Sequence, residues 1–244
     1  MNRDVPLKKY QKKMEYSYTL GAFPTVELLK NQPGKALKVL LHSNLTSISE
    51  RELVTKLCAE NQVPIENGDK AIARISDKEN CMVAGVFEKY TTRLNEKANH
   101  VVLVNPSDMG NAGTIIRTCL GFGVTEIAII GQGVDVFHPK VARASMGALF
   151  QVRIQYFQNF EEYYNVYHNV GRTFYPFMLK GATDLSCLER DREGLFSLVF
   201  GNEASGLDDA YLEVGKSVFI RHSDKIDSLN LSMAVGIALF EFTR

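Results

Sequence analysis

The spacing of Asn111, Gly113 and Arg117 could hold an anion or the polar edge of a sugar. The three residues lie in segment 108–123, which follows an apolar run and predicts a strand, a glycine turn and a helix. Asn111 is a good N-cap residue. Arg117 shares a helical face with Gly113, so its side chain leans back over the glycine toward the helix-end amides. The alternative is a capped helix whose arginine caps a neighbouring carbonyl or makes a salt bridge.

This glycine turn differs from the two common nucleotide-binding loops. A dinucleotide-binding turn needs GxGxxG and an acidic residue at the end of the second strand. Here Gly110 and Gly113 are spaced GxxG, and the segment IAIIGQG contains no acid. A phosphate loop of the GxxxxGK(S/T) type needs a lysine that is missing here. The sequence therefore disfavours a nicotinamide enzyme, an ATP enzyme and a small-molecule methyltransferase built on a Rossmann sheet.

Two further polar loops follow apolar strands. Glu203 lies in LVFGNEASGL, at the carboxyl end of a predicted strand, where ligands bind in open α/β sheets. Ser228 and Asn230 lie in SDKIDSLNLSMA, at the mouth of an apolar helix. Each loop has a simpler interpretation: a surface glutamate in the first case, and helix capping by Asp227 or Ser228 in the second. If the three loops meet in one crevice, their side chains form a polar site.

The elements that must position these loops alternate along the second half of the chain. Strands fit residues 101–104, 126–130, 152–157, 173–179, 195–200 and 217–220, and helices fit 112–122, 139–147, 160–170 and 229–242. Apolar strands without alternation, separated by helices, predict a parallel sheet that is covered on both faces. The last helix is apolar nearly all round, so it is either the central helix of one core or buried against a second subunit.

The first half predicts a smaller α/β unit over residues 18–92, followed by a linker at 93–99. Ser49 is the expected N-cap of its middle helix, with Glu52 as the capping-box partner. Residues 1–17 form a basic arm that either grips a nucleic-acid backbone or is only solvated. Helices fit 20–31, 49–61 and 68–76, strands fit 36–43, 63–65 and 81–90, and the basic residues of the arm are Arg3, Lys8, Lys9, Lys12 and Lys13.

The composition sets further bounds. The 244 residues fit one large domain or two smaller ones, and 45% apolar residues is ordinary for a globular chain. Basic and acidic residues balance at 28 each, so a nucleic-acid partner would need a local basic patch. The scattered cysteines disfavour a disulfide framework or a zinc site and favour a reducing cytosol. No apolar run reaches roughly 18 residues, and the N-terminus is no secretory signal. We expect a cytoplasmic protein with no membrane span and no metal.

Together the three polar loops resemble the SpoU (TrmH) family of RNA methyltransferases in the SPOUT superfamily. The family motifs read NxGxxxR, GxExxGL and SLNxSxA with a closing ExxR, and all occur here in family order over most of residues 100–244. Two positions depart from the pattern: Met109 stands where proline is common, and Ile220 is followed by Arg221 rather than by proline. The matching residues are Asn111, Gly113, Arg117, Gly201, Glu203, Gly206, Leu207, Ser228, Leu229, Asn230, Ser232, Ala234, Glu241 and Arg244.

The resemblance implies an architecture and a set of partners. Residues 100–244 would form an α/β catalytic domain with a SPOUT-type parallel sheet and a C-terminal trefoil knot, whereas the residue pattern by itself predicts an unknotted open sheet. Residues 18–92 are similar to the ribosomal-protein-like domain that binds the RNA substrate. S-adenosylmethionine would be the cofactor, and the protein would work as a homodimer on RNA.

The implied reaction is methylation of a ribose 2′-hydroxyl, in ribosomal RNA rather than transfer RNA. Transfer RNA and a non-catalytic RNA-binding role are the alternatives. By motif position, Gly201, Ile220 and Leu229 would bind the cofactor, with the glycine leaving room for it and the two aliphatic side chains enclosing adenine. The transfer needs no metal, because it requires only an aligned oxygen and a means of removing its proton.

The resemblance also implies catalytic roles. Arg117 and Asn111 would meet the RNA phosphate and ribose. Arg117 would either accept the hydroxyl proton or, since a guanidinium essentially never deprotonates, clamp the phosphate and stabilise the developing alkoxide. Glu203 and Asn230 would position Arg117 and the loops, with Ser228 in support.

Overall fold

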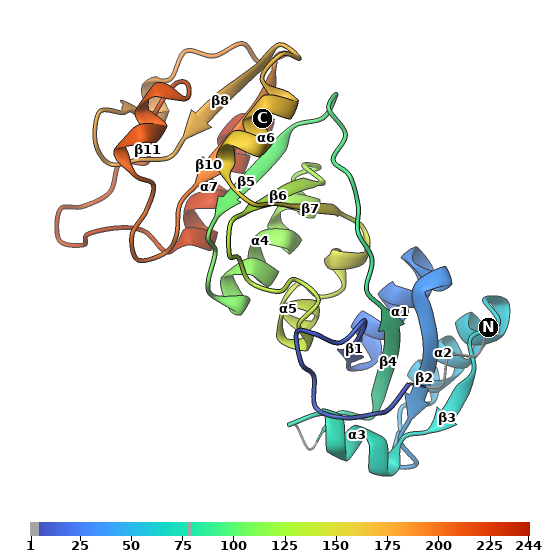
Figure 1. The fold of residues 1–244 in the computed structure, drawn as a ribbon. Coiled ribbons are helices and arrows are strands. Elements are labelled where there is room, and N and C mark those ends of the chain that lie inside the picture. Colours follow the sequence, from blue (N-terminus) through green and yellow to red (C-terminus); the bar gives the residue numbers. More distant parts are fainter. Residues whose placement is uncertain (1–4, 78–79) are drawn as a thin grey trace. The chain divides into compact units, whose positions relative to one another are not determined.

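The computed structural model describes residues 5–77 and 80–244, which divide into two compact units (Figure 1). Unit 1 comprises Met1–Tyr90 and Asp135–Gln151, and unit 2 comprises Thr91–Val134 and Val152–Arg244. The segment Asp135–Gln151 falls within the expected catalytic range 100–244, yet it clusters with unit 1 because its helix packs on the first strand there. Arg3 of the basic arm lies outside the described residues.

Unit 1 is built on a four-stranded sheet in the order β1-β4-β2-β3, in which β2 and β3 are parallel and the other neighbours antiparallel. Tyr18 and Ile72 lie in an apolar core on one face of this sheet, and Leu29 and Val54 lie in a second core on the other. Its elements are β1 (Tyr16–Leu20), α1 (Ala22–Asn31), η1 (Pro33–Lys35), β2 (Ala36–Leu41), α2 (Ile48–Glu60), β3 (Ile65–Asn67), α3 (Asp69–Ile75), β4 (Val83–Glu88), α5 (Pro139–Ala144) and η2 (Ala148–Phe150).

Two details of unit 1 differ from the sequence-based expectations. β1 was missing from the sequence-based assignment although its residues alternate between apolar and polar, and its polar residues Ser17 and Thr19 are fully buried and hydrogen-bonded. The N-cap of α2 is Ser47 and not Ser49, since the Ser47 hydroxyl accepts from the backbone N–H of Glu50 at 3.4 Å. The capping-box prediction was therefore wrong by two residues, and the helix begins one residue earlier than expected.

Unit 2 contains the predicted parallel sheet, with five strands in the order β7-β6-β5-β10-β8 and every neighbouring pair parallel. The predicted strand at 217–220 is instead part of a separate two-stranded sheet, in which β11 pairs with β9. Leu103 of β5 pairs with Phe200 of β10, so the loops that follow these central strands start side by side. The strands are β5 (His100–Val104), β6 (Glu126–Ile130), β7 (Arg153–Phe157), β8 (Arg172–Pro176), β9 (Thr183–Asp184), β10 (Leu195–Phe200) and β11 (Val218–Phe219).

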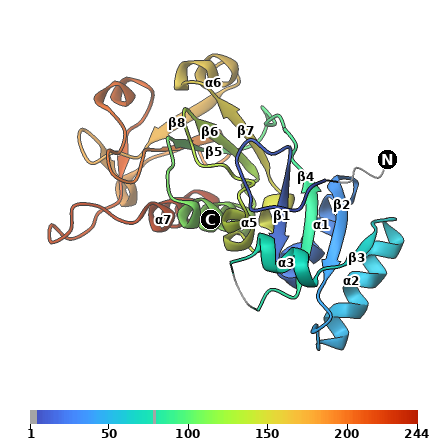
Figure 2. The same ribbon diagram turned by 60° about the horizontal axis from the view of Figure 1, so that its bottom comes forward.

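Helices cover both faces of the five-stranded sheet (Figures 1 and 2). On one face, Tyr163 of α6 packs in a core with Val102 and Ala128. On the other face, α4 and α7 lie against each other, and Phe242 of α7 contacts the ring of Phe196. The helices are α4 (Met109–Gly121), α6 (Phe160–Tyr167) and α7 (Leu231–Thr243), with 3-10 turns η3 (Leu185–Cys187) and η4 (Asp209–Glu213).

Only one side of α7 is buried. Val235 and Leu239 are buried in the unit, while Met233, Ile237 and Phe240 are 60%, 38% and 57% exposed. These three apolar side chains recur at helical spacing, so they form one stripe on the surface. The interpretation of α7 as a central helix of a single core is therefore wrong, and its burial against a second subunit stays a prediction.

Arg172, at the start of β8, is a buried cation that joins the residues before β5 to the sheet. Its guanidinium donates to the carbonyl oxygens of Phe196 at 2.8 Å, Glu96 at 2.8 Å and Ala98 at 2.7 Å. Burial, and then the charge of Arg172, lower the pKa of the neighbouring His100 to about 3, so that imidazole stays neutral.

We expect Arg172→Leu to lower the free energy of unfolding by about 3 kcal/mol, because the leucine leaves carbonyl oxygens in a buried setting without their donor. Urea unfolding monitored by circular dichroism measures the loss. Arg192→Leu is the matched control, since Arg192 is exposed. Equal stability of the two variants would contradict the role given to Arg172.

Membrane spans, metal sites and cysteine pairing can be checked in the described residues. Within residues 5–77 and 80–244, no helix is long and apolar enough to cross a bilayer. The same residues contain no group of three or more His, Cys, Asp or Glu side chains placed to hold a metal ion. Cys58, Cys81, Cys119 and Cys187 are free thiols.

Candidate active site

The three polar loops of unit 2 meet at the carboxyl ends of β5 and β10. Glu203, in the loop after β10, is at the centre of the contact. Its carboxylate accepts from the Ser107 N–H at 3.1 Å, the Ser107 hydroxyl at 2.9 Å and the Asp108 N–H at 3.1 Å. It also accepts from the amide nitrogens of Asn111 at 3.3 Å and Asn202 at 3.4 Å. Glu203 thus holds the loop before α4 in place.

The charge of Glu203 follows from these contacts. Burial by itself would raise the pKa of the Glu203 carboxyl, but the hydrogen bonds that it accepts, from Ser107 and Asp108 among others, outweigh burial and hold the pKa below its ordinary value. The carboxylate is therefore ionised at neutral pH, and its oxygens are already occupied by donors. This environment suits a residue that positions the loops better than one that exchanges a proton with substrate.

Asn230 extends the same network to the start of α7. Its amide nitrogen donates to the Asn111 side-chain oxygen at 3.1 Å, while its own oxygen accepts from the Ser232 N–H at 2.9 Å and the Ser232 hydroxyl at 2.7 Å. The hydrogen bonds form one chain: Ser232 donates to Asn230, Asn230 donates to Asn111, and Asn111 donates to Glu203. Both amide side chains therefore have one orientation. The structure brings together Asn111, Glu203 and Asn230 from three separate segments.

The helix caps differ from the sequence-based assignments. Asp108 caps α4, accepting from the Asn111 N–H at 2.6 Å, so Asn111 lies inside the first turn rather than at the cap. Asn230 caps α7, and neither Asp227 nor Ser228 does. Both errors have one cause: several residues with cap-forming side chains stand in a row, and only tertiary contacts decide which of them turns back onto the helix.

Gly201 and Gly206 shape the turn that carries Glu203. A Cβ on Gly201 would lie 2.1 Å from the carbonyl carbon of Gly206, so no side chain fits between these two stretches of backbone. Gly206 has a φ of 67°, and its N–H donates to the Asn202 oxygen at 2.9 Å. The returning loop takes the space on the side where a Gly201 side chain would lie, which by itself requires a glycine there, and cofactor binding by Gly201 stays a prediction.

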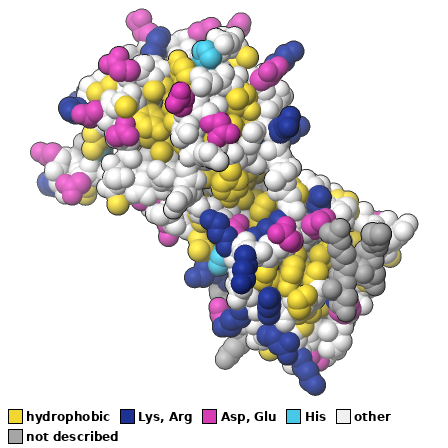
Figure 3. Space-filling view, in the orientation of Figure 1, with side chains coloured by type: hydrophobic (Ala, Val, Ile, Leu, Met, Phe, Trp, Pro, Cys, Tyr) yellow, Lys and Arg dark blue, Asp and Glu magenta, His cyan; other side chains and the backbone are white. Residues whose placement is uncertain are grey.

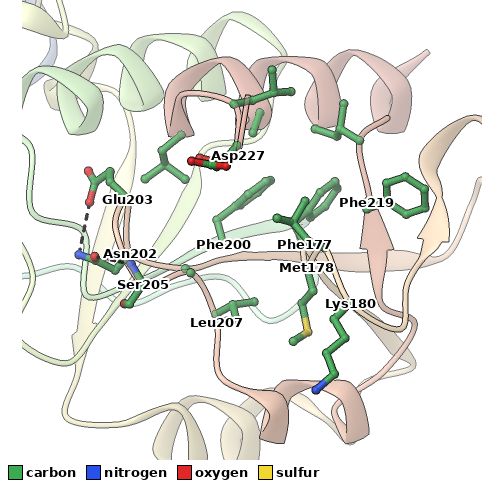
Figure 4. Close-up of a pocket in the computed structure, with 18 of the residues that line it drawn as sticks. Phe177, Met178, Lys180, Phe200, Asn202, Glu203, Ser205, Leu207, Phe219 and Asp227 are labelled. Carbon is green, nitrogen blue, oxygen red and sulfur yellow. Dashed lines mark hydrogen bonds between the residues drawn. The ribbon is translucent and has the colours of Figure 1, made fainter. Parts of the chain in front are cut away.

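An apolar pocket of about 440 Å³ opens beside this network. Phe177 and Phe200 stack in its centre, with ring centroids 4.5 Å apart, while Glu203 and Asn202 lie at one end (Figure 4). The volume falls within the roughly 300–1,000 Å³ of small-molecule sites. Apolar walls with a polar end suit a ligand that joins an aromatic base to a charged tail. The predicted residues Gly201, Ile220 and Leu229 line the pocket, as do Glu203 and Ser228.

Sequence reasoning missed the aromatic residues of this pocket. Phe177 and Phe200 stand at the ends of apolar strands, where they are expected as ordinary core residues. The available signal was their position, since ligands in parallel sheets bind at the carboxyl ends of the strands.

Arg117 does not join the network within its own chain. Its side chain is exposed on α4 and makes no hydrogen bond or ion pair with any described residue. Arg117 lies six positions after Asn111, about 240° around the helix, so the two side chains point in different directions. The expectation that the guanidinium reaches the loop across Gly113, held there by Glu203 and Asn230, is therefore not met in a single chain.

The SpoU rRNA methylase family model matches residues 98–240, more than half of the chain, so this protein belongs to that family. The match contains all three polar loops and confirms the resemblance. The predicted cofactor is confirmed as well, because S-adenosylmethionine is the cofactor of the family and a matched structure of an rRNA methyltransferase is described as AdoMet-bound.

Individual relatives agree on the class and differ in the RNA that their names mention. An uncharacterized tRNA/rRNA methyltransferase of Synechocystis is 31% identical over 59% of this chain, which spans only 52% of that relative. A putative tRNA (cytidine(34)-2′-O)-methyltransferase of Listeria monocytogenes is 30% identical over 60% of this chain and 87% of its own length. The AdoMet-bound rRNA methyltransferase of Sinorhizobium meliloti has a TM-score of 0.79 and 28% identity, covering 93% of this chain and 87% of that chain.

Proposed function

We propose that this protein transfers a methyl group from S-adenosylmethionine to a ribose 2′-hydroxyl of RNA. One observation carries the proposal: three family motifs from separate segments are hydrogen-bonded to one another at the edge of an apolar pocket of cofactor size. The bound cofactor supplies an activated methyl group. The residues of the chain exclude water around it and hold the accepting oxygen in line.

The residues of the pocket have different roles in the proposed methyl transfer. Ile220 and Leu229 enclose the adenine, and Phe177 offers an aromatic face beside them. Glu203 and Asn230 keep Asn111 fixed in position through the hydrogen bonds of the network. Ser228, exposed at the rim and without a hydrogen-bond partner in the described residues, is free to contact substrate.

A homodimer provides a way for Arg117 to act. The exposed stripe of Met233, Ile237 and Phe240 on α7 continues to Phe122 at the end of α4, whose ring centroid is 6.5 Å from that of Phe240. A partner covering this stripe by two-fold symmetry would lie beside α4, the helix that carries Arg117. We propose that the Arg117 of one chain completes the pocket of the other, where it clamps the phosphate or accepts the proton.

The trefoil knot and the RNA class belong to the same proposal. The insertion of β10, late in the chain, between β5 and β8 supports a threaded C-terminal segment. The match that covers both units is named an rRNA methyltransferase, whereas the relative named for tRNA cytidine 34 covers 60% of this chain. This difference in coverage favours ribosomal RNA, with residues 18–92 as the substrate-binding domain.

Two measurements test the function directly. Mapping 2′-O-methyl marks in total RNA from cells with and without the protein should reveal at least one mark that depends on it, and the RNA that carries the mark decides between ribosomal and transfer RNA. Calorimetry should detect S-adenosylmethionine binding to the purified protein. RNA binding without cofactor binding would support the non-catalytic alternative.

We expect Ile220→Asp to weaken S-adenosylmethionine binding by about tenfold or more, because it places an unpaired carboxylate in an apolar pocket. Calorimetric titration with cofactor measures the change. Val166→Asp is the control, since Val166 is an exposed apolar residue of α6 that does not line the pocket. Unchanged affinity in the Ile220 variant would mean that adenine lies elsewhere.

A further inference from the structure

Residues 5–17 of the N-terminal arm are folded against the rest of unit 1. The Tyr18 hydroxyl donates to the carbonyl oxygen of Lys8 at 2.8 Å, and the Tyr16 hydroxyl donates to that of Pro6. The ammonium of Lys89 donates to the Lys12 oxygen at 2.8 Å. These bonds hold the backbone of the arm at three places. The backbone from which its lysines project is therefore held in place, which is not expected of a merely solvated tail.

The arm also contacts the segment before α5. The hydroxyl of Tyr10 donates a hydrogen bond to the carboxylate of Asp135. The centroid of the Tyr10 ring lies 5.1 Å from that of His138, with the rings edge to face. Residues 135–151 are inside the family match, yet they complete a surface of unit 1. The arm and α5 are thus parts of one surface, although more than a hundred residues separate them in sequence.

Basic side chains gather where these elements meet. The guanidinium of Arg74, on α3, donates to the Leu7 oxygen at 3.4 Å, and Lys9 pairs with Asp77 at 2.8 Å. The bond and charge of Lys9 lower the pKa of the Asp77 carboxyl, and the nearby charge of Lys140 on α5 lowers it further. We call Lys8, Lys9, Lys12, Lys13, Arg74 and Lys140 the basic strip; all six are exposed.

The strip carries an excess of positive charge. Figure 3 shows Lys and Arg side chains gathered over the part of unit 1 where the arm and α5 lie in Figure 1. Among the described residues, the acids of the adjoining segments are Glu15, Asp77 and Asp135, and Asp135 is already paired with Lys89 at 3.3 Å. Lys8, Lys12 and Lys13 make no ion pair with any described residue. Their charges remain available to a polyanion.

The two units differ in net charge. Unit 1 has 16 basic and 12 acidic residues, whereas unit 2, which carries the pocket, has 12 basic and 16 acidic residues. An acidic unit repels the phosphates of an RNA chain, so long-range attraction has to come from unit 1. The balanced charge of the whole sequence hides this division.

We propose that the basic strip binds the sugar–phosphate backbone of the RNA substrate and does so without reading its bases. The inference rests on the proposed RNA methyltransferase function and adds where the RNA is held. Lysine ammonium groups are point charges that bind phosphate oxygens with little demand on geometry, and phosphate contacts carry no sequence information. Its contribution is therefore equal for target and non-target RNA.

The test compares two triple variants of the full-length protein. Lys12→Gln, Lys13→Gln and Lys140→Gln remove three charges of the strip. Lys30→Gln, Lys35→Gln and Lys56→Gln remove three lysines of unit 1 that are paired with Glu27, Glu88 and Glu60. Both triples change the net charge equally. Binding of a short synthetic RNA hairpin of arbitrary sequence is measured over a series of salt concentrations, with thermal unfolding to verify folding.

We expect the strip triple to reduce the slope of log affinity against log salt by about 2, since each lost phosphate contact removes roughly 0.7–0.9 from it. The control triple should leave the slope nearly unchanged. In methylation assays the strip triple should raise the KM for RNA without changing kcat or cofactor affinity.

Equal weakening by both triples would overturn the proposal, because it would reflect net charge alone. No weakening by the strip triple, in a protein that still methylates RNA, would overturn the strip and leave the proposed function intact. A wild-type protein that binds no RNA at any salt concentration would refute both. The two failures are therefore distinguishable.

Discussion

Arg117→Ala should abolish methyl transfer while leaving the fold and cofactor binding nearly unchanged. Arg117 is exposed and has no partner among the described residues, so its loss should change the free energy of unfolding by only about 0.5 kcal/mol or less. It does not line the pocket of its own chain, and the role proposed for it in the partner's pocket is toward RNA, so cofactor affinity should hold. Removing a cation that stabilises developing charge in a dry site typically costs about 10²–10³ in rate.

Single-turnover methylation of RNA measures the rate of methyl transfer, and calorimetric titration measures the affinity for the cofactor. Arg192→Ala is the matched control, because Arg192 is another exposed arginine of unit 2. Activity like that of the wild type in Arg117→Ala would remove Arg117 from the mechanism.

Arg117→Lys separates the two roles left open for the guanidinium. A lysine keeps the positive charge but loses the planar pair of donors, and it releases its proton far more readily than arginine does. If Arg117 clamps phosphate, the lysine variant should keep part of the activity with an unchanged pH profile. If Arg117 accepts the proton, activity should extend to lower pH in the lysine variant.

The second large effect concerns the exposed stripe of α7. The double variant Ile237→Glu and Phe240→Glu should be a monomer by sedimentation and should not methylate RNA, because two charges on this stripe would have to be buried in the proposed dimer. Val166→Glu, which alters an exposed apolar residue of α6, should leave the dimer intact. A dimer that survives the double variant would place the interface on another surface.

A complementation experiment then asks which pocket Arg117 serves. Heterodimers of an Arg117→Ala chain and an Ile220→Asp chain, isolated with two affinity tags, contain one defective arginine and one defective pocket. If Arg117 acts across the interface, one of the two sites is complete and about half of the wild-type rate should return. If Arg117 acts within its own chain, each site has one defect and the heterodimer should be inactive.

The sequence predicted the parallel sheet and the three polar loops for a physical reason. Buried parallel strands are continuous apolar runs, and the residues at their carboxyl ends are released from core packing and can carry chemistry. Glu203 could be predicted in this way from its place after a strand. Its hydrogen bonds to Ser107 and Asp108 could not, since they depend on β5 and β10 being neighbours despite their distance in sequence.

Other features depended on tertiary contacts that periodicity does not encode. Position 201 requires a glycine because the backbone of the returning loop lies where a side chain would be. Helix α5 clusters with unit 1, although its residues lie within the match to the methyltransferase family. The side-chain direction of Arg117 was predicted from a helix starting at Asn111, but Asp108 caps it three residues earlier. That shift places Asn111 inside the first turn, where it lies about 240° around the helix from Arg117.

The hydrogen-bonded path from Ser232 to Glu203 has a consequence for biosynthesis. It joins the start of the last helix to the start of the first helix of unit 2, so the side-chain oxygen of Asn111 gains its donor only when α7 has docked. A polypeptide that stops short of Asn230, through premature termination or proteolysis, lacks the donor to the Asn111 oxygen. If Asn111 takes part in the proposed methyl transfer, we expect a chain that ends before Asn230 to transfer methyl groups poorly, even though it keeps the basic strip of unit 1.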